Sequence, residues 1–335
     1  MMDQDSEFNG ETARVSPLGG TESAFVSLAE AFAKLGHNVV AMTKITKDLV
    51  YEGVHWKSIN SSINKCDLSI VNRAPELLDR IPTASKSILW LHNPANYLSK
   101  LRNFRRLFFK RITVICSGKY HFDTLPSWIK SRAVILPLGI TDELFLCETT
   151  PEKAPDPEVI FTSNPERGLA WLVDIWHNKI ITAVPNAKLN VYAGSKTYGG
   201  RHEDLMTNIL NDITNLKEES IKVFEPIEKK YLFKKISESR AMLYLGDKGE
   251  TFCLAVAEAQ ALGLPCIVKP IGCLAERVKH NLTGEVIMDD TSFVNSAINI
   301  LTNDKDWSFY RDNCIKLQRD FKWENIAKKY LNLIN

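Results

Sequence analysis

Two carboxylates stand out by their type and spacing. Glu250 and Glu258 lie in the segment GETFCLAVAEAQALGLPCIV (249–268), where a strand predicted at 241–246 leads into a helix predicted at 253–263. In an open α/β sheet, ligands bind in the loops at the carboxyl ends of the strands. The first turn of the next helix offers N–H groups and a positive dipole end that suit a diphosphate, and a carboxylate there can accept two hydrogen bonds from a ribose diol. The same pair could also be a capping carboxylate and a surface glutamate.

Short apolar strands alternate with amphipathic helices along the whole chain. Each strand is too short for a helix and is rich in Val, Ile or aromatic residues. This alternation predicts parallel sheets in α/β units, whose strands are buried on both faces. The predicted strands are 37–43, 67–72, 87–92, 113–117, 133–138, 158–163, 189–194, 221–224, 241–246 and 265–270, and the clearest helices are 23–36 and 253–263.

One segment interrupts this pattern. CETTPEKAPDPE (147–158) contains three prolines and several charges, which is typical of a linker. The strand–helix pattern resumes after it, so we expect two Rossmann-like domains, at 1–146 and 159–320. The first should begin with a buried strand, yet residues 1–16 contain almost no apolar side chains. The strand is absent here, or the true start lies upstream of Met1; we favour a shortened start.

Composition excludes several classes of protein. The 335 residues are 44% hydrophobic, which is ordinary for a globular chain and excludes wholesale disorder. No apolar run approaches ~18 residues, and the acidic, polar N-terminus lacks the regions of a signal peptide. Seven scattered cysteines without a C-x-x-C pair argue against zinc or a disulfide framework and for a reducing compartment. The net charge of +2 gives no case for nucleic acid binding.

Residues 249–268 resemble the Glu-x7-Glu signature of retaining, nucleotide-sugar-dependent glycosyltransferases of the GT-B fold, family four in particular. Cys253 stands where that family usually has Gly, and Cys266 is a second departure. The residues that match are Glu250, Thr251, Phe252, Leu254, Glu258, Ala259, Gly263 and Pro265. Other stretches resemble family motifs in the same order, and together they cover nearly the whole chain: 18–43 (the Gly-Gly loop, helix and strand), LWLHNP (89–94), LPLGI (136–140), SNPERGL (163–169) and FKWENIAKKYL (321–331).

The resemblance implies that the second domain binds the sugar nucleotide. Glu258 would hold the ribose hydroxyls, and Glu250 would lie near the donor sugar or the reaction centre. Arg167 would neutralise the departing diphosphate, because a guanidinium stabilises a leaving group that gains negative charge. Ser163 and Asn164 could add neutral donors, or serve only the turn and helix cap. Backbone N–H groups would contact the sugar and diphosphate around Thr251, Phe252, Cys253 and Leu254.

In the first domain the resemblance implies an acceptor site. Gly19 and Gly20 would let the backbone approach the phosphate and the acceptor, because no Cβ intervenes. Thr21 could contact either group or cap the helix. His92 ends an apolar strand and would contact the donor sugar, although a structural histidine is an equal alternative; we do not assign it as a general base. For retaining enzymes of this fold, front-face attack assisted by the leaving phosphate is the usual proposal.

A second feature is the basic segment KLRNFRRLFFKR (100–111). As a helix it is amphipathic and cationic, which is typical of an interfacial membrane element. A core helix with a solvated basic face, or a groove for an anionic acceptor such as a phosphorylated lipid-linked glycan, would have the same composition.

Taken together, the resemblance predicts an α/β protein of the GT-B fold, with two Rossmann-like domains facing a cleft and a helix at 321–335 crossing back to the first domain. We expect transfer from a nucleotide-diphosphate sugar to a glycan, glycolipid or lipid-linked acceptor, in surface polysaccharide or glycolipid synthesis. No D-x-D motif follows a strand, so neither a metal nor another cofactor is expected. The location would be the cytoplasm, at the inner membrane face if 100–111 binds lipid. A non-catalytic sugar-nucleotide-binding subunit and a nucleotide-sugar epimerase are the alternatives.

Overall fold

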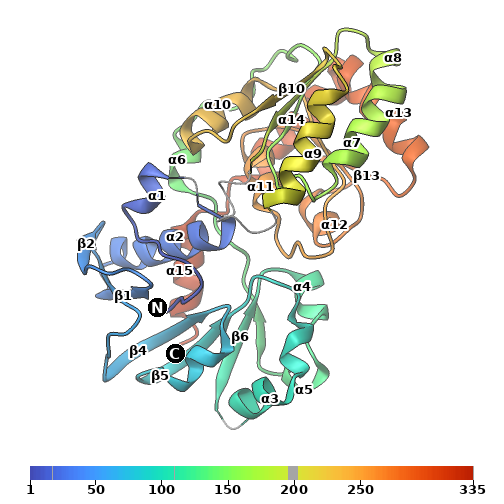
Figure 1. The fold of residues 1–335 in the computed structure, drawn as a ribbon. Helices are drawn as coiled ribbons and strands as arrows, with labels where there is room; N and C mark the ends of the chain where they lie inside the picture. Colours follow the sequence, from blue (N-terminus) through green and yellow to red (C-terminus); the bar gives the residue numbers. More distant parts are fainter. Residues whose placement is uncertain (17, 109, 195–202, 335) are drawn as a thin grey trace. The chain divides into compact units, whose positions relative to one another are not determined.

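The computed structural model describes residues 1–16, 18–108, 110–194 and 203–334, and the chain divides into two units. The first unit comprises Met1–Thr141 and Phe321–Asn335, and the second comprises Asp142–Asp320 (Figure 1). Each unit is an α/β structure built on parallel strands.

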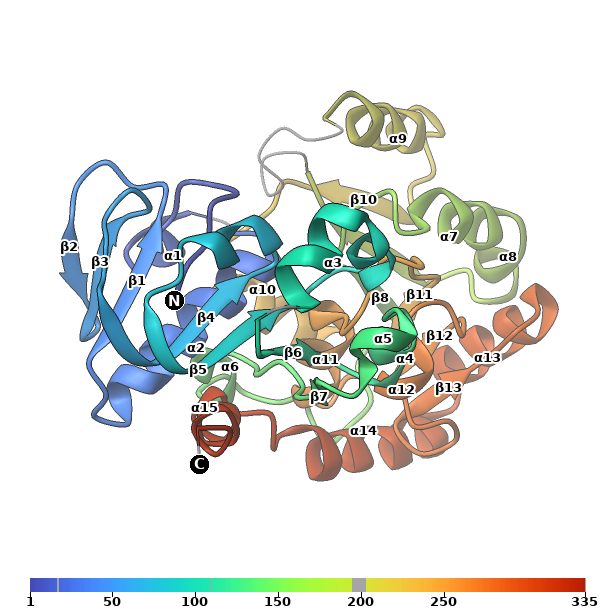
Figure 2. The ribbon, with the colours of Figure 1, turned by 90° about the horizontal axis from the view of Figure 1, so that it is seen from below.

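The strands of the first unit form two groups. Three strands lie in the order β1-β3-β2 and four in the order β4-β5-β6-β7, and all pairs are parallel except β2 with β3 (Figure 2). The strand bounds are β1 Val39–Thr43, β2 Leu49–Tyr51, β3 Val54–Ser58, β4 Lys65–Asn72, β5 Thr83–Trp90, β6 Ile112–Cys116 and β7 Ala133–Ile135. The helices are α1 Thr12–Val15, α2 Gly20–Lys34, η1 Pro75–Asp79, η2 Ala95–Ser99, α3 Leu101–Phe108, α4 Lys119–Asp123, α5 Ser127–Lys130 and α15 Trp323–Leu331.

The N-terminal strand expected before the Gly19-Gly20 loop is reduced to the bridges made by one residue, Met2. Met2 bridges Met42 of β1 on one side and Val71 of β4 on the other, both in parallel. Its N–H donates to the carbonyl of Ile70 at 2.9 Å, and the N–H of Asp3 donates to the carbonyl of Met42 at 2.9 Å. Two backbone bridges thus join the two groups of strands, and the Met2 side chain is 2% exposed. Sequence patterning missed this strand because its pairing spans too few residues to show a period.

The second unit is also built from parallel strands that alternate with helices. Its parallel strands lie in the orders β10-β9-β8 and β11-β12-β13, and a bridge between Val159 and Ala241 joins β8 to the start of β11. The strand bounds are β8 Glu158–Phe161, β9 Lys188–Tyr192, β10 Ile221–Phe224, β11 Met242–Tyr244, β12 Cys266–Val268 and β13 Gly284–Val286. The helices are α6 Asp142–Phe145, α7 Leu169–Ile175, the π-helical turn η3 Trp176–Ile180, α8 Ile181–Ala183, α9 Glu203–Asn215, α10 Lys229–Glu238, α11 Leu254–Ala261, α12 Leu274–Arg277, α13 Asp290–Thr302 and α14 Asp304–Gln318.

The C-terminal helix belongs to the first unit, as predicted. In α15 the buried residues recur with helical spacing, at Trp323, Ile326, Ala327 and Tyr330, and this stripe packs against α2. Tyr330 meets the ring of Phe32 edge-on at 6.3 Å. Trp323 also closes over Gly139, where an added Cβ would lie 2.4 Å from the indole.

The segment predicted as a linker, 147–158, is held on the second unit. Thr150 is fully buried; its N–H donates to the carbonyl of Leu262 at 2.8 Å and its hydroxyl to that of Gly263 at 3.1 Å. Arg311 in turn donates to the Thr150 carbonyl at 2.7 Å. The division between the units accordingly falls between Thr141 and Asp142, ahead of the prolines, because these buried bonds fasten the segment to one side.

Candidate functional site

Two loops meet at the carboxyl edge of the sheet in the second unit. One follows β8 and carries Arg167, and the other follows β11 and carries Glu250. β8 and β11 are neighbours in the sheet, so both loops leave it at the same place. The structure brings the two predicted residues together: Nη1 of Arg167 donates to Oε1 of Glu250 at 2.9 Å.

Glu250 is enclosed by donors. The Tyr244 hydroxyl donates to its Oε1 at 2.9 Å, and the N–H of Asp247 donates to its Oε2 at 3.1 Å. Its side chain is 1% exposed, whereas that of Arg167 is 38% exposed. The pKa of Tyr244 is raised well above its usual value, first by burial and then by the neighbouring Cys253 and Glu250, so its hydroxyl stays protonated and able to donate. Sequence reasoning missed Tyr244 because it reads as one more apolar strand residue.

The loop after β8 owes its shape to local contacts. The side chain of Asn164 accepts from the N–H of Glu166 at 2.9 Å, and its carbonyl accepts from the N–H of Arg167 at 2.9 Å, so Asn164 serves the turn. The Ser163 hydroxyl lies 2.8 Å from that of Tyr244, which links the two loops. Gly168 then adopts a φ of +92° as α7 begins, a conformation that favours glycine.

The loop after β11 enters α11 through a strained residue. Cys253 has a φ of +59°, in the left-handed region, and its side chain is buried. The pKa of Cys253 is raised well above its usual value by burial and then by the charge of Glu250. Thr251 and Phe252 are also buried, and the Arg277 guanidinium lies 4.4 Å from the Phe252 ring centroid. Leu254 opens the helix, whose first-turn N–H groups have no carbonyl partner within it.

The strain at Cys253 gives a testable expectation. Cys253→Gly removes the penalty for a Cβ at positive φ and loses a small buried thiol, so its free energy of unfolding should stay within about 1 kcal/mol of the wild type. Cys253→Val places a β-branched side chain in that conformation and should cost about 2 kcal/mol or more. Urea unfolding measures both, and a valine variant as stable as the glycine variant would contradict the assignment of strain.

Glu258 has a partner that sequence reasoning did not find. The ammonium of Lys229, at the start of α10, forms an ion pair with Oε1 of Glu258, whose side chain is 8% exposed. Within the described ranges no hydrogen bond reaches Oε2 of Glu258. Lys229 is 29 residues away, and only the packing of α10 on α11 brings it there.

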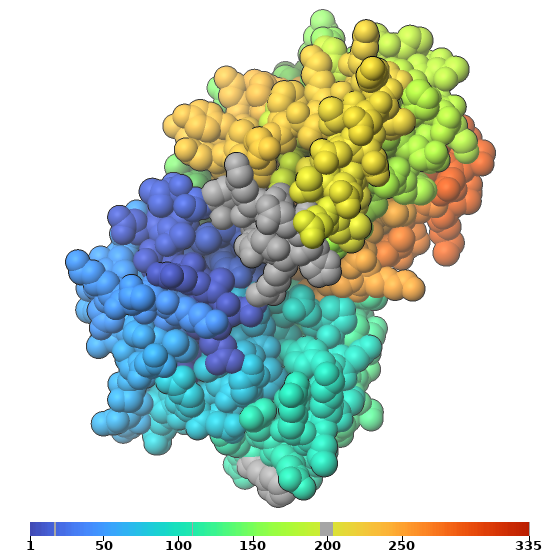
Figure 3. All heavy atoms as spheres, in the orientation of Figure 1, coloured from blue at the N-terminus to red at the C-terminus, as the bar shows by residue number. Residues whose placement is uncertain are grey.

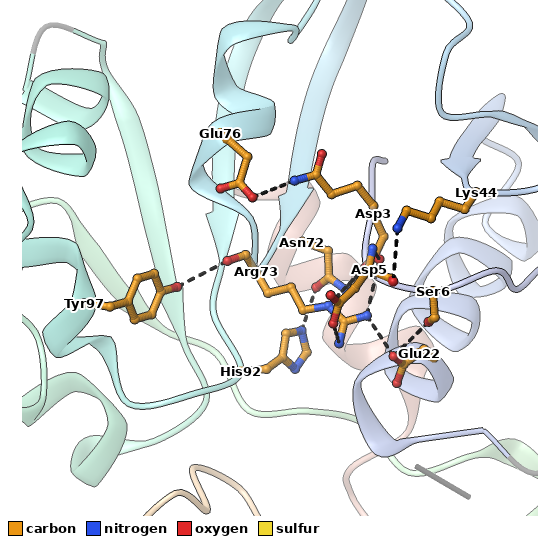
Figure 4. Close-up of polar contacts among 11 residues, drawn as sticks. Asp3, Asp5, Ser6, Glu22, Lys44, Asn72, Arg73, Glu76, His92 and Tyr97 are labelled. Carbon is orange, nitrogen blue, oxygen red and sulfur yellow. Dashed lines mark hydrogen bonds and ion pairs between the residues drawn. The ribbon is translucent and has the colours of Figure 1, made fainter. Parts of the chain in front are cut away.

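A second polar cluster lies at the carboxyl edge of the sheet in the first unit (Figure 4). His92 lies just beyond β5, and its Nε2 is 2.8 Å from Oδ1 of Asn72, whose amide donates to Asp3 at 2.6 Å. Its ring lies against that of Trp90 at an interplanar angle of 53°, with the centroids 4.5 Å apart. Burial, and then the charges of Arg73 and His121, hold the pKa of His92 well below its usual value, so the imidazole is neutral.

Arg73 is the centre of that cluster, and sequence reasoning missed it. Its guanidinium pairs with Asp3 at 3.0 Å, with Asp5 at 3.1 Å and with Glu22 at 2.8 Å. Glu22 lies in the first turn of α2, beside Gly19, where an added Cβ would lie 2.6 Å from the Glu22 carboxylate.

Two further predicted residues lie in that first turn. The N-cap of α2 is Gly19, without a side-chain hydrogen bond, and Gly20 is the first helical residue. Thr21 is half-buried and already helical. The alternative in which Thr21 caps the helix is therefore wrong, because the helix begins one residue before it.

The basic segment forms α3, and Phe109 within it lies outside the described residues. Asn103 and Leu107 are buried, while Leu101 is 65% and Phe108 48% exposed, seven residues apart and so on one face. Arg102 and Arg105 are exposed beside them. The teal surface of the first unit in Figure 3 includes this region.

No helix in the described ranges is long and apolar enough to cross a membrane. No group of three or more His, Cys, Asp or Glu side chains there is placed to hold a metal ion.

Comparisons with known proteins bear on the family and the fold of this chain. Residues 156–303 match the family of glycosyl transferases group 1. A probable sucrose-phosphate synthase from Thermosipho melanesiensis is 23% identical over 221 residues, which is 65% of this chain and 50% of that protein, so the match spans half the length of the relative.

Solved structures match over almost the full length. Sucrose-phosphate synthase from Thermosynechococcus elongatus has a TM-score of 0.72 at 16% identity, covering 99% of this chain and 97% of the other. Anabaena HepE, solved with UDP-glucose, has a TM-score of 0.71 at 13% identity and covers 99% and 98%. These proteins are GT-B glycosyltransferases with two Rossmann-like domains. Residues 156–303 therefore resemble the glycosyl transferases group 1 family, and the chain as a whole has the GT-B fold.

Proposed function

We propose that this protein is a retaining glycosyltransferase that uses a nucleotide-diphosphate sugar as its donor. The observation that carries the proposal is the half-exposed Arg167 fixed beside the loop that leads into the first turn of α11. A guanidinium next to a helix N-terminus is a suitable site for a diphosphate. HepE, which has the same fold, was solved with UDP-glucose, and this supports a sugar nucleotide as the donor class.

Each residue of the site would have a separate role in binding the donor or in the transfer. Oε2 of Glu258 would accept hydrogen bonds from the ribose hydroxyls, while Arg167 and the N–H groups from Thr251 to Leu254 would bind the diphosphate and sugar. In the transfer, the bond from the anomeric carbon to the diphosphate oxygen breaks and a bond from the acceptor hydroxyl forms on the same face. The departing diphosphate takes the acceptor's proton. Arg167 stabilises the charge that develops on it, and no metal ion is required.

The acceptor would bind at the first unit. Gly20 and Thr21 in the first turn of α2, together with His92, lie at the carboxyl edge of that sheet, where ligands of α/β units bind. The neutral His92 would contact a hydroxyl of the donor sugar. We propose a glycan, glycolipid or lipid-linked acceptor, in the synthesis of a surface polysaccharide or glycolipid.

Donor hydrolysis tests this function directly. The purified full chain is incubated with a panel of nucleotide sugars, with and without EDTA, and released nucleoside diphosphate and free sugar are measured. Slow release from one donor, with the anomeric configuration retained and no loss in EDTA, is the expected result. Activity that disappears in EDTA and returns with Mn²⁺ or Mg²⁺ contradicts metal independence. Binding without turnover, even with acceptors, would point to a sugar-nucleotide-binding subunit.

We also propose that α3 brings the enzyme to an anionic membrane surface, in the cytoplasm. Its exposed face alternates Leu101 and Phe108 with Arg102 and Arg105, and residues 100–111 contain no acidic residue. Apolar side chains among arginines suit the boundary between lipid headgroups and acyl chains.

Vesicle sedimentation tests this contact. Arg102→Gln/Arg105→Gln should bind vesicles containing about one-third phosphatidylserine roughly 30-fold more weakly than the wild type, because each cation near the surface contributes about 1 kcal/mol. Lys305→Gln/Lys316→Gln, which removes two exposed lysines of α14, is the matched control and should bind like the wild type. Equal binding to uncharged phosphatidylcholine vesicles would contradict the proposal.

A further inference from the structure

We infer that Glu250 is a positioning residue, which acts on the donor through Arg167 rather than by touching it. This rests on the proposed function, because it concerns how the diphosphate is bound. The assignment differs from the sequence-based expectation that Glu250 lies against the donor sugar or the reaction centre.

Glu250 is buried within its own loop. The Glu250 side chain is 1% exposed, so a sugar cannot reach its carboxylate without displacing the loop around it. Two glycines make that loop tight. An added Cβ on Gly246 would lie 3.2 Å from Oε2 of Glu250, and one on Gly272 would lie 2.9 Å from the Glu250 carbonyl oxygen. The N–H of Cys273 also donates to that carbonyl at 3.2 Å.

Both carboxylate oxygens of Glu250 already accept hydrogen bonds within the protein. Oε1 accepts from Arg167 and Tyr244, each at 2.9 Å, and Oε2 accepts from the N–H of Asp247 at 3.1 Å. Glu258 differs, because Oε1 alone has a partner in the described part of the chain. The two glutamates of the motif therefore have different roles. Glu258 can accept a hydrogen bond from a ligand, whereas Glu250 forms an ion pair with Arg167 of the protein.

Holding Arg167 in place before a ligand arrives lowers the entropy cost of binding. A free arginine side chain loses considerable rotamer entropy when it binds an anion. A buried carboxylate on Nη1 fixes the plane of the guanidinium in advance, and its charge is compensated by the same contact. Tyr244 holds the carboxylate, and Ser163 lies 2.8 Å from the Tyr244 hydroxyl, so the chain of bonds runs from one loop to the other.

Calorimetry with two ligands tests the inference: the nucleoside diphosphate that the wild type binds, and the corresponding nucleoside without phosphates. Glu250→Gln should weaken nucleoside diphosphate binding at least 10-fold and leave nucleoside binding within twofold. Glu258→Gln is the matched control, since the same change eight residues away should weaken both ligands equally. Tyr244→Phe keeps the carboxylate and should weaken only the diphosphate, by two- to fivefold. Glu250→Gln/Arg167→Gln should bind no more weakly than Arg167→Gln alone.

Each other outcome overturns the inference. If Glu250→Gln lowers turnover but keeps its affinity for the nucleoside diphosphate, Glu250 acts on the sugar. If the double variant loses the product of the two single effects, the residues act independently. If Glu250→Gln does not fold, an unchanged affinity of Tyr244→Phe for the nucleoside diphosphate also overturns the inference. A wild type that binds neither ligand refutes the proposed function, and this inference with it. If the wild type binds both ligands, the proposed binding site stands and the variants test this inference alone.

Discussion

Replacing Arg167 with glutamine should lower kcat/KM for sugar transfer by about 100- to 1,000-fold, the range found when one preorganised donor to a developing negative charge is removed. The side chain is 38% exposed and anchored at 2.9 Å to a buried carboxylate, so it can reach a ligand while staying in place. Most of the loss should appear in kcat, because the diphosphate carries more negative charge in the transition state than in the bound donor.

The measurement is steady-state transfer with the donor identified in the hydrolysis screen. Lys179→Gln, which removes an exposed cation from the same unit, is the control for loss of charge alone and should retain wild-type rates. If Arg167→Gln keeps its kcat while only KM rises, the arginine binds ground state and transition state equally. A rate within threefold of the wild type would remove Arg167 from the catalytic machinery.

Gly168→Ala should lower the free energy of unfolding by about 3 kcal/mol, from two sources of roughly 1–2 kcal/mol each. One is the φ of +92°, which a residue with a Cβ adopts only with strain. The other is a clash, since the new Cβ would lie 2.4 Å from the Cβ of Leu245, in the loop that follows β11. Because both loops of the site would have to separate, Arg167 and Glu250 should also lose their contact, and diphosphate affinity should fall.

Gly36→Ala separates these two sources. Gly36 follows α2 with a φ of +88°, but nothing lies within 4 Å of an added Cβ there. Its variant should therefore lose only the strain, about 1 kcal/mol. Urea unfolding of both variants gives the difference. If both variants lost the same free energy of unfolding, the chain around Leu245 would move aside for the new Cβ with little loss of stability.

Much of this protein follows from local pattern. Apolar runs predict ten of its strands because a strand buried on both faces needs apolar side chains at every position, as in β6, where all five residues are buried. Glu250 and Glu258 are singled out because their types and spacing fit the end of a strand, and Arg167 because the segment that carries it resembles a family motif. The strands β2, β3 and β13 are missed, because β2 and β3 form an antiparallel pair outside the strand–helix alternation and β13 has only one buried residue.

Tertiary structure decides which groups meet. Tyr244 and Lys229 become partners of the two glutamates only through strand order and helix packing, and Arg73 gathers Asp3, Asp5 and Glu22 across up to 70 residues of sequence. The same holds for Met2, whose two bridges complete the sheet. Sequence determined where strands, helices and chemically capable residues lie, because periodicity and residue type are local properties. The tertiary structure decided that Glu250 is buried behind Arg167, because burial depends on what the rest of the chain places around a side chain.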